Sequence, residues 1–452
     1  MEVPATTLEE AYAAVELFPL ESGDPRYVDC AQVRGGPDAR LDEVMGWRIE
    51  VAKQPIHQLL SSQRGCGKST ELLRLARRLR DKGYFVIYFA ADEDIDVGDV
   101  EYTDVLLSII KRLERALAEE GIEVDPELVR SILLWFAEVV YGWTDEREVE
   151  RILEAEFGLG AMAPLSLIAK MLARLTGHIK TGRQVRREVR LKLDPQISQL
   201  LERVNLFIHS ALTDLKKKGW KDLVILIDNL DRIALRVLDE RTGRTSHDAV
   251  YLEHACQLKA LDAHLIYTVP LSMFYSLRAT ELTIDAFPKY FILPMIKVQE
   301  EDGRPCEEGI AILREVAEKR IDVGRLFAPG VVEYLAAKSG GMIRDFLRLL
   351  GYTIEMASAR GGKLPIEKAI AEGAFQRLVN EYGRMVPDEH FPLLARVHRE
   401  KRVKNDAEHQ AMLYNLSVLE YLDGRRWCDV HPAVLELREF KEAWERERGI
   451  AH

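Results

Sequence analysis

Residues 62–70 read SQRGCGKST, and this stretch decides the fold. It matches the pattern G-x-x-x-x-G-K-[ST] at every diagnostic position except the first, where Ser62 stands in place of glycine. In that pattern a tight turn before a helix points successive backbone N–H groups at phosphate oxygens, and the positive end of the helix dipole assists. We therefore predict a phosphate-binding loop between a strand and a helix. Ser62 implies either a turn that needs no positive φ at this position or local strain.

Each position of this loop has an expected task. Gly65 and Gly67 leave room for the backbone to approach the phosphates. Lys68 reaches the β- and γ-phosphates, and Ser69 ligates magnesium. The nucleotide-binding residues that the pattern predicts are Arg64, Gly65, Cys66, Gly67, Lys68, Ser69 and Thr70. We expect ATP and Mg²⁺ as the cofactors, although the loop alone fits GTP equally well.

The sequence around the loop alternates between strand and helix patterns. A short apolar run at 55–61 precedes the loop, leucines at helical spacing follow it from 70 to 82, and a second apolar run covers 84–90. Strand, loop, helix and strand in this order form a βαβ unit, which implies a parallel sheet. The expected fold class is therefore α/β, with a five-stranded parallel sheet completed by the apolar runs at 223–228, 263–270 and 290–294.

The run at 223–228 ends in an aspartate, as expected of the strand that faces the magnesium ion. Asp228 is predicted to reach the water shell of that ion. Many ATPases place a glutamate next, as the base for the attacking water, but Asn229 cannot accept that proton. Asp231 is the nearest carboxylate and is our candidate base. The alternative is a turn in which Asp231 and Arg232 form an ion pair.

Two further residues are candidates for sensing the γ-phosphate. Thr268 ends the next predicted strand, where it lies between the nucleotide and Asp228 or else only caps its own strand. Arg344 lies in the stretch SGGMIRDFL at 339–347, which opens a helix and directs the arginine toward the γ-phosphate, unless it is an ordinary surface arginine. The predicted catalytic residues are Asp231, Thr268 and Arg344, and the predicted metal ligands are Ser69 and Asp228.

The patterns divide the chain into four expected parts. A turn-rich arm covers 1–40, and the phosphate-binding core covers 41–300 with a helical insertion at about 95–215. A helical lid follows at 301–385. In residues 386–452, helices precede two β-rich runs joined at Asp423-Gly424, which is a hairpin signal and predicts a winged helix.

Composition narrows the class of protein. The net charge of −11 over 452 residues argues against a protein coated in nucleic acid, although a local basic patch is compatible with it. Five dispersed cysteines without a C-x-x-C pair indicate reduced intracellular thiols. The N-terminus lacks the pattern of a signal peptide, and the most apolar stretch, 159–169, is shorter than the ~20 residues that span a bilayer. We expect a cytoplasmic protein without membrane contact.

The motifs together resemble the AAA+ and STAND branches of the P-loop ATPases. The stretch RGCGKST at 64–70 and the strand ending DNLDR at 228–232 look like STAND-type and origin-recognition-type ATPases. Arg344 in its Gly-Gly-x-x-Arg setting is similar to the sensor 2 of origin-recognition-type AAA+ proteins. The resemblance implies a winged helix after the lid, ATP bound between core and lid, and ATP-dependent self-association. An arginine of one subunit then completes the neighbouring site, and Arg278 is the candidate, although a solvated surface arginine is the alternative.

Three functions remain open at this stage. The first is a slow ATPase switch that couples nucleotide state to oligomerisation and to a separate effector or adaptor protein, by family analogy in a bacterial defence or signalling pathway. The second is a DNA-binding ATPase of the initiator, loader or transposition-regulator type that uses its winged helix. The third is a scaffold that binds nucleotide without turnover. The basic residues that favour DNA are Arg396, Arg399, Lys401, Arg402, Lys404, Arg425, Arg426 and the run at 180–192.

Overall fold

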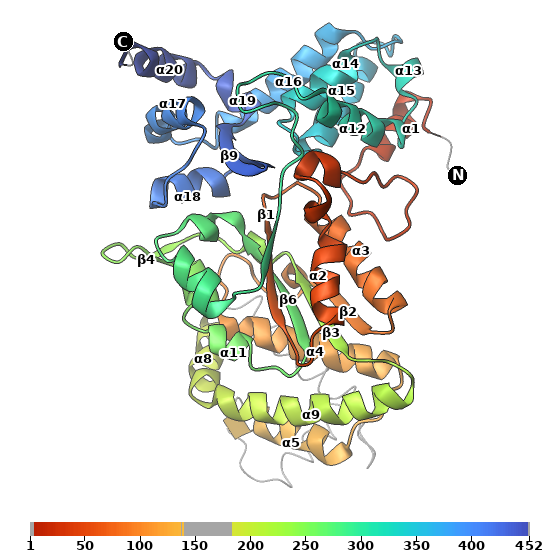
Figure 1. Cartoon of the computed structure of the whole chain (residues 1–452), viewed down its shortest axis with the longest axis vertical. Helices are drawn as coiled ribbons and strands as arrows, with labels where there is room; N and C mark the ends of the chain where they lie inside the picture. Colours follow the sequence, from red (N-terminus) through yellow and green to blue (C-terminus); the bar gives the residue numbers. More distant parts are fainter. Residues whose placement is uncertain (1–3, 137, 140–182, 451–452) are drawn as a thin grey trace.

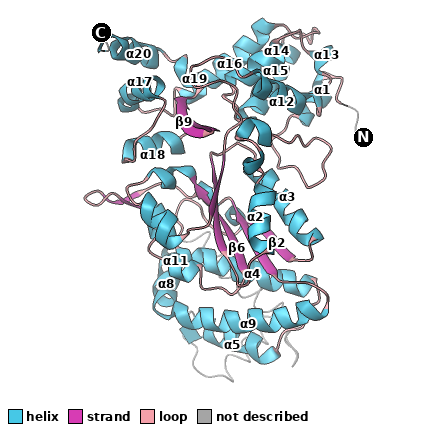
Figure 2. Cartoon of the chain, viewed as in Figure 1, coloured by secondary structure: helices cyan, strands magenta, loops and turns pink. Residues whose placement is uncertain are grey.

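A five-stranded parallel sheet forms the centre of the molecule (Figures 1 and 2). The computed structural model describes residues 4–136, 138–139 and 183–450. The strands lie in the order β2-β3-β6-β1-β7, and every neighbouring pair is parallel. Their bounds are β1 His57–Ser62, β2 Phe85–Ala90, β3 Leu223–Asp228, β6 His264–Pro270 and β7 Tyr290–Leu293. The predicted α/β fold with a five-stranded parallel sheet is confirmed.

Helices cover both faces of this sheet, which explains why its strands are apolar at consecutive positions. Leu60 faces a core formed with α2 (Leu41–Glu50) and α3 (Lys68–Asp81), whereas its neighbour Leu59 faces the larger core on the other side. That larger core includes α4 (Tyr102–Glu119). Because strand residues alternate between the two faces, both faces require apolar side chains.

The chain between β2 and β3 is the predicted helical insertion. Its described helices are α4, α5 (Pro126–Phe136), α8 (Arg183–Leu193) and α9 (Ile197–Lys217). The helices α5 and α9 lie at the end of the molecule opposite the lid (Figure 1). The first residues of the basic run at 180–192 lie outside the described residues.

The lid and the C-terminal part lie together at the other end of the core (Figure 1). The predicted hairpin is confirmed, with a left-handed Gly424 (φ 66°) between its strands β8 and β9. The lid consists of α12 Glu307–Glu318, α13 Val323–Leu326, α14 Val331–Lys338, α15 Ile343–Ala359 and α16 Lys368–Tyr382. The C-terminal part consists of α17 Phe391–Glu400, α18 Ala407–Tyr414, β8 Val418–Asp423, β9 Arg425–Val430, α19 Pro432–Leu435 and α20 Arg438–Ile450.

Several elements were not predicted. An N-terminal helix, α1 (Leu8–Ala14), packs against α15 of the lid. A second hairpin, β4 (Val237–Asp239) with β5 (Arg244–Thr245), follows β3 and precedes the short helices α10 (Ser246–Tyr251) and α11 (Ala255–Leu258). Among the described residues, no helix is long and apolar enough to cross a membrane.

A buried carboxyl group in the insertion gives a prediction about stability. Glu114 of α4 is 1% exposed, neither carboxyl oxygen has a hydrogen-bond partner within the described structure, and burial raises its pKa to about 8. The folded protein therefore holds this proton more tightly than the unfolded chain, so the free energy of unfolding falls as pH rises from about 4.5 to 8. We expect Glu114→Gln to leave stability unchanged near pH 5 and to raise it by roughly 2 to 4 kcal/mol at pH 9.

Urea unfolding of both proteins at the two pH values measures this difference. Equal stability of Glu114→Gln and the parent chain at pH 9 would show that the carboxyl group ionises without cost. Glu119→Gln, on the exposed side of the same helix, is the matched control.

Candidate nucleotide-binding site

The loop after β1 has the backbone of a phosphate-binding loop. Gly65 and Gly67 have φ angles of 96° and 100°, which strongly favour glycine, and α3 begins at Lys68. A Cβ atom at Gly65 would lie 2.8 Å from Cβ of Arg344, so a side chain there would push the lid helix α15 away. Both glycines are therefore required by the loop and by the lid that packs on it.

Ser62 is the last residue of β1 and does not have a positive φ. It pairs in register with Pro270 of β6 and Leu293 of β7. The backbone at position 62 therefore needs no glycine, and the absence of the first glycine of the pattern causes no strain in φ. Its hydroxyl is buried without a hydrogen-bond partner among the described residues.

The loop turns its carbonyl groups outward. The carbonyl of Gly65 accepts from the backbone N–H of Arg344 at 3.0 Å, and that of Cys66 accepts from Nη2 of Arg34 at 2.5 Å. Within the described part of the chain no acceptor exists for the backbone N–H groups of Gly65, Gly67, Lys68, Ser69 and Thr70. Unpaired N–H groups at a helix N-terminus form an anion site. This part of the structure fits a nucleoside triphosphate.

Lys68 and Asp231 form a buried ion pair. Nζ of Lys68 lies 2.5 Å from Oδ1 of Asp231, and the side chains are only 7% and 4% exposed. The pair shows that the predicted base lies within reach of the phosphate-binding lysine. A triphosphate therefore competes with Asp231 for the ammonium group of Lys68.

Asp228 is buried below the loop at the end of β3. Its carboxylate accepts from the hydroxyl of Tyr88 on β2 at 3.0 Å and from the backbone N–H of Asn229 at 2.7 Å. These two donors fix the orientation of the carboxylate. Asp228 does not line the cavity above the loop, whereas Asp231 does. Its role as a metal ligand stays a prediction.

Arg232 does not pair with Asp231, so that alternative is wrong. Nη1 of Arg232 donates to Oδ2 of Asp92 at 2.6 Å, and Nδ2 of Asn229 donates to the other oxygen of Asp92 at 2.9 Å. Asn229 has a φ of 63°, which turns the chain sharply after β3. That turn brings Asp231 to Lys68 and leaves Arg232 facing Asp92, which follows β2.

Thr268 lies between the strand of the loop and the strand of Asp228. It is fully buried in β6, and its hydroxyl accepts from the backbone N–H of Leu230 at 3.0 Å. The hydroxyl thus holds the turn that carries Asp231, and Thr268 does not line the cavity. Its predicted contact with nucleotide remains a prediction.

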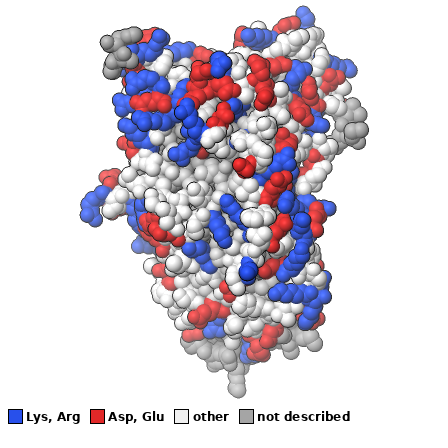
Figure 3. Space-filling model, viewed as in Figure 1, with Lys and Arg blue, Asp and Glu red and all other residues white. Residues whose placement is uncertain are grey.

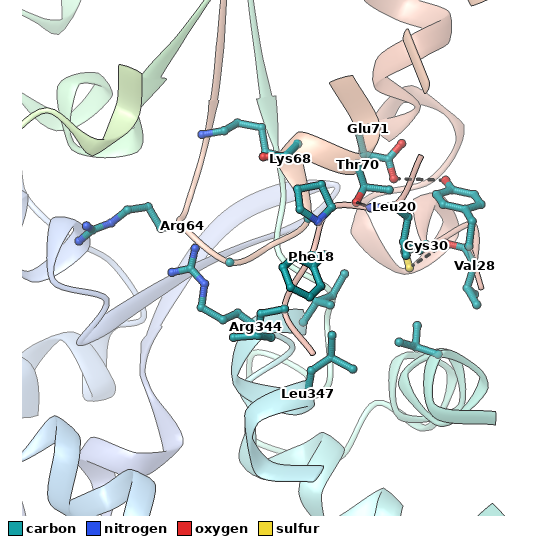
Figure 4. A pocket seen from close by; sticks show the side chains of 18 of the residues that line it. Phe18, Leu20, Val28, Cys30, Arg64, Lys68, Thr70, Glu71, Arg344 and Leu347 are labelled. Carbon is teal, nitrogen blue, oxygen red and sulfur yellow. Dashed lines mark hydrogen bonds between the residues drawn. The ribbon is translucent and has the colours of Figure 1, made fainter. Parts of the chain in front are cut away.

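Arg344 lies at the start of α15 and lines the cavity (Figure 4). Within the described structure, no carboxylate pairs with its guanidinium group. Burial, together with the charges of Arg64 and Arg232, holds the pKa of Arg344 below its ordinary value. Cations that repel one another around one cavity favour binding of an anion there. This geometry agrees with the predicted role at the γ-phosphate.

The cavity has a volume of about 190 Å³ and extends from the loop to the N-terminal arm and the lid. Phe18 is 71% exposed and lies at the cavity together with Leu347 of the lid (Figure 4). The arm is tied to α3, because the backbone N–H of Leu20 donates to the hydroxyl of Thr70 at 3.1 Å. The apolar lining residues from the arm and the lid include Leu17, Phe18, Pro19, Leu20, Val28, Val316, Ile343 and Leu347.

Arg34 is a residue of the site that was not predicted from the sequence. It is 2% exposed, and its guanidinium donates to the carbonyl groups of Cys66 and Pro294. A buried arginine that binds loop carbonyls fixes the loop and adds positive charge beside it. Its one sequence signal was its position before the Gly35-Gly36-Pro37 turn.

Arg278 pairs within its own chain. Its guanidinium donates to Oε1 and Oε2 of Glu281 at 2.7 and 2.8 Å, and Glu253 lies 3.7 Å away. Its assignment to a neighbouring site stays a prediction, and it would require these pairs to open.

No protein-family model and no curated protein sequence matches this chain. Among solved structures, the chain is similar to the crystal structure of Cdc6p from Pyrobaculum aerophilum, with 13% sequence identity and a TM-score of 0.36. The match covers 90% of this chain and 93% of that chain. The strand order and the loop geometry are those of the P-loop NTPase fold.

Proposed function

We propose that this chain is an ATP-binding and slowly hydrolysing switch, in which nucleotide state controls the packing of lid and C-terminal part on the core. One observation carries the proposal. Five loop residues whose backbone N–H groups have no partner in the described structure line one cavity between the core and the lid, and Lys68 and Arg344 extend their side chains at the same cavity. A ligand with several negative charges in a row is the chemical match for that arrangement.

Each residue of the site has a separate role in the proposed hydrolysis. Lys68 and the loop N–H groups bind the β- and γ-phosphates, and Arg344 holds the γ-phosphate from the lid side. Magnesium, which Ser69 and Asp228 would hold, would neutralise charge on the phosphate oxygens. Binding draws Lys68 from Asp231, whose carboxylate then accepts a proton from the attacking water as the bond between the γ-phosphorus and the bridging oxygen breaks. With Asn229 in place of a glutamate, turnover is expected to be slow.

Calorimetric titration of the full chain with a slowly hydrolysed ATP analogue and Mg²⁺ tests the proposal. The same titration with the corresponding GTP analogue shows whether the site prefers adenine or guanine. Saturable one-site binding is expected. Absence of binding to either nucleotide would refute the proposed function. Single-turnover hydrolysis of ATP then separates a switch from a scaffold, which would bind without turnover.

Self-association on ATP binding is part of the proposed switch and has its own test. We expect the mass in solution to rise to a multiple of the 51.6 kDa chain when the ATP analogue is added. The Lys68→Ala variant should stay at the mass of the nucleotide-free protein. A parent chain that remains monomeric under all conditions would contradict the assembly model, while leaving nucleotide binding intact.

DNA binding is the second candidate, and the hairpin tip favours it. Arg425 and Arg426 are 76% and 54% exposed at the turn between β8 and β9. Arg425 pairs with Glu301 and Arg426 lies 3.8 Å from Glu420, and further basic residues of this part are in ion pairs, for example Arg399 with Glu447 and Lys401 with Asp429. Positive and negative side chains are interspersed over this part (Figure 3). The tip of the hairpin is therefore the place where a contact with DNA is to be tested.

Binding of a fluorescent duplex at increasing salt measures this second function. If the hairpin contacts phosphates, we expect Arg425→Glu with Arg426→Glu to weaken binding and to reduce the slope of log K against log salt by about 2. Arg304→Glu, an equally exposed arginine outside the C-terminal part, is the control. Binding that is absent or insensitive to salt would remove DNA as a candidate.

A further inference from the structure

Two residues of the phosphate-binding loop, Gln63 and Arg64, line the edge of the cavity and extend their side-chain polar groups to the C-terminal part. The side-chain amide of Gln63 donates to the carbonyl of Val418 at 2.6 Å and accepts from the backbone N–H of Glu420 at 2.8 Å. Gln63 thus pairs with the free edge of β8 as the backbone of a neighbouring strand would. Its side chain is 4% exposed, so both contacts are shielded from water.

The next residue reaches the same part of the molecule. Nη2 of Arg64 donates to the carbonyl of Tyr414 at 2.6 Å, and the guanidinium lies 4.5 Å from the centre of the Tyr414 ring. The Arg64 side chain leaves the loop on the side opposite Phe18 and Thr70 (Figure 4). Tyr414 itself donates to the carbonyl of Ile233, close to the turn that carries Asp231.

These contacts fix the loop in its anion-binding shape. The carbonyl of Gln63 accepts from the N–H of Cys66 at 3.4 Å, which makes the first turn of the loop. The carbonyls of Gly65 and Cys66 are held by α15 and by Arg34. Contacts with α15, Arg34 and the C-terminal part therefore hold the loop at successive residues, and its N–H groups point toward the cavity. A loop that is already ordered loses less conformational entropy when phosphate binds.

We propose that Gln63 is a positioning residue through which the C-terminal part holds the phosphate-binding loop, so that nucleotide binding and docking of this part on the core strengthen one another. The proposal rests on the proposed nucleotide binding. Coupling between two equilibria is reciprocal, so an effect of docking on nucleotide affinity requires an equal effect of nucleotide on docking. A residue with a purely structural role has no such reciprocal effect.

Hydrogen exchange of the backbone amides in β8, above all that of Glu420, reports docking in the full chain. We expect the ATP analogue to slow this exchange several-fold in the parent protein. In Gln63→Ala, exchange should be faster without nucleotide, and the ATP analogue should bind about 5- to 20-fold more weakly. Gln376→Ala, at an exposed glutamine of α16, is the matched control and should behave as the parent chain in both measurements.

The outcomes distinguish this inference from the proposed function. Faster β8 exchange on adding the analogue would overturn the inference, because it would mean that nucleotide releases the C-terminal part. Unchanged affinity in Gln63→Ala would also overturn it. Failure of the parent chain to bind nucleotide would instead refute the proposed function, and the nucleotide-free exchange of Gln63→Ala would still show whether Gln63 holds the hairpin. Exchange in β3 shows whether Gln63→Ala is folded. We expect it to remain slow, and fast exchange there would indicate that the variant has lost its fold.

Discussion

Replacement of Lys68 by alanine is expected to weaken binding of the ATP analogue at least 100-fold. The variant removes the side-chain cation at the first residue of α3, which is the ammonium group expected between the β- and γ-phosphates. It also leaves the buried carboxylate of Asp231 without its partner. Breaking a buried ion pair from one side costs about 3 kcal/mol, so the variant should also be less stable.

A double variant separates these two effects. In Lys68→Ala with Asp231→Asn neither position of the buried pair carries a charge, so stability should return toward that of the parent chain while nucleotide binding stays lost. Titration calorimetry measures the affinity, and urea unfolding measures the stability. An affinity within threefold of the parent chain in Lys68→Ala would show that the phosphates do not bind at this loop.

The sequence was sufficient for the parts of the fold that depend on local pattern. The five strands of the sheet are apolar at consecutive positions because helices cover both faces, and each was expected within two residues of its observed bounds. The loop is equally local, since two glycines with positive φ and a helix beginning at Lys68 form one continuous stretch. The short hairpin β4–β5 was missed because its strands, of three and two residues, are too short to show an alternating pattern.

Contacts between distant parts of the chain could not be predicted in this way. Arg34 reaches Pro294, and Gln63 reaches Val418, across 260 and 355 residues. The composition of neither segment predicts such a contact. The alternative in which Arg232 pairs with Asp231 was wrong for the same reason. Asp231 is adjacent in sequence, but the left-handed Asn229 turns the two side chains apart, and Arg232 donates to Asp92 instead. Sequence proximity is a poor guide to ion pairing wherever a tight turn intervenes.

Replacement of Asp231 by asparagine should have opposite effects on hydrolysis and on binding. Loss of the proposed base is expected to lower the single-turnover rate by 10²- to 10⁴-fold. Binding of ATP should become tighter, by roughly 10-fold, because Lys68 no longer has to leave a buried carboxylate before it meets the phosphates and because one negative charge near the γ-phosphate is gone. Asparagine has nearly the same shape, so the turn held by Thr268 should persist.

The comparison variant is Asp228→Asn, measured with Mg²⁺ and with a chelator. Its carboxylate lies below the loop and makes no contact with Lys68, so its loss should slow hydrolysis without tightening binding in the chelator. Asp231→Asn should tighten binding under both conditions, since its effect passes through Lys68 and not through the metal. If Asp231→Asn hydrolyses ATP at the rate of the parent chain, Asp231 is not the base. If the parent chain and Asp231→Asn both show only the background rate, the chain is a nucleotide-binding scaffold and its switch operates by binding alone.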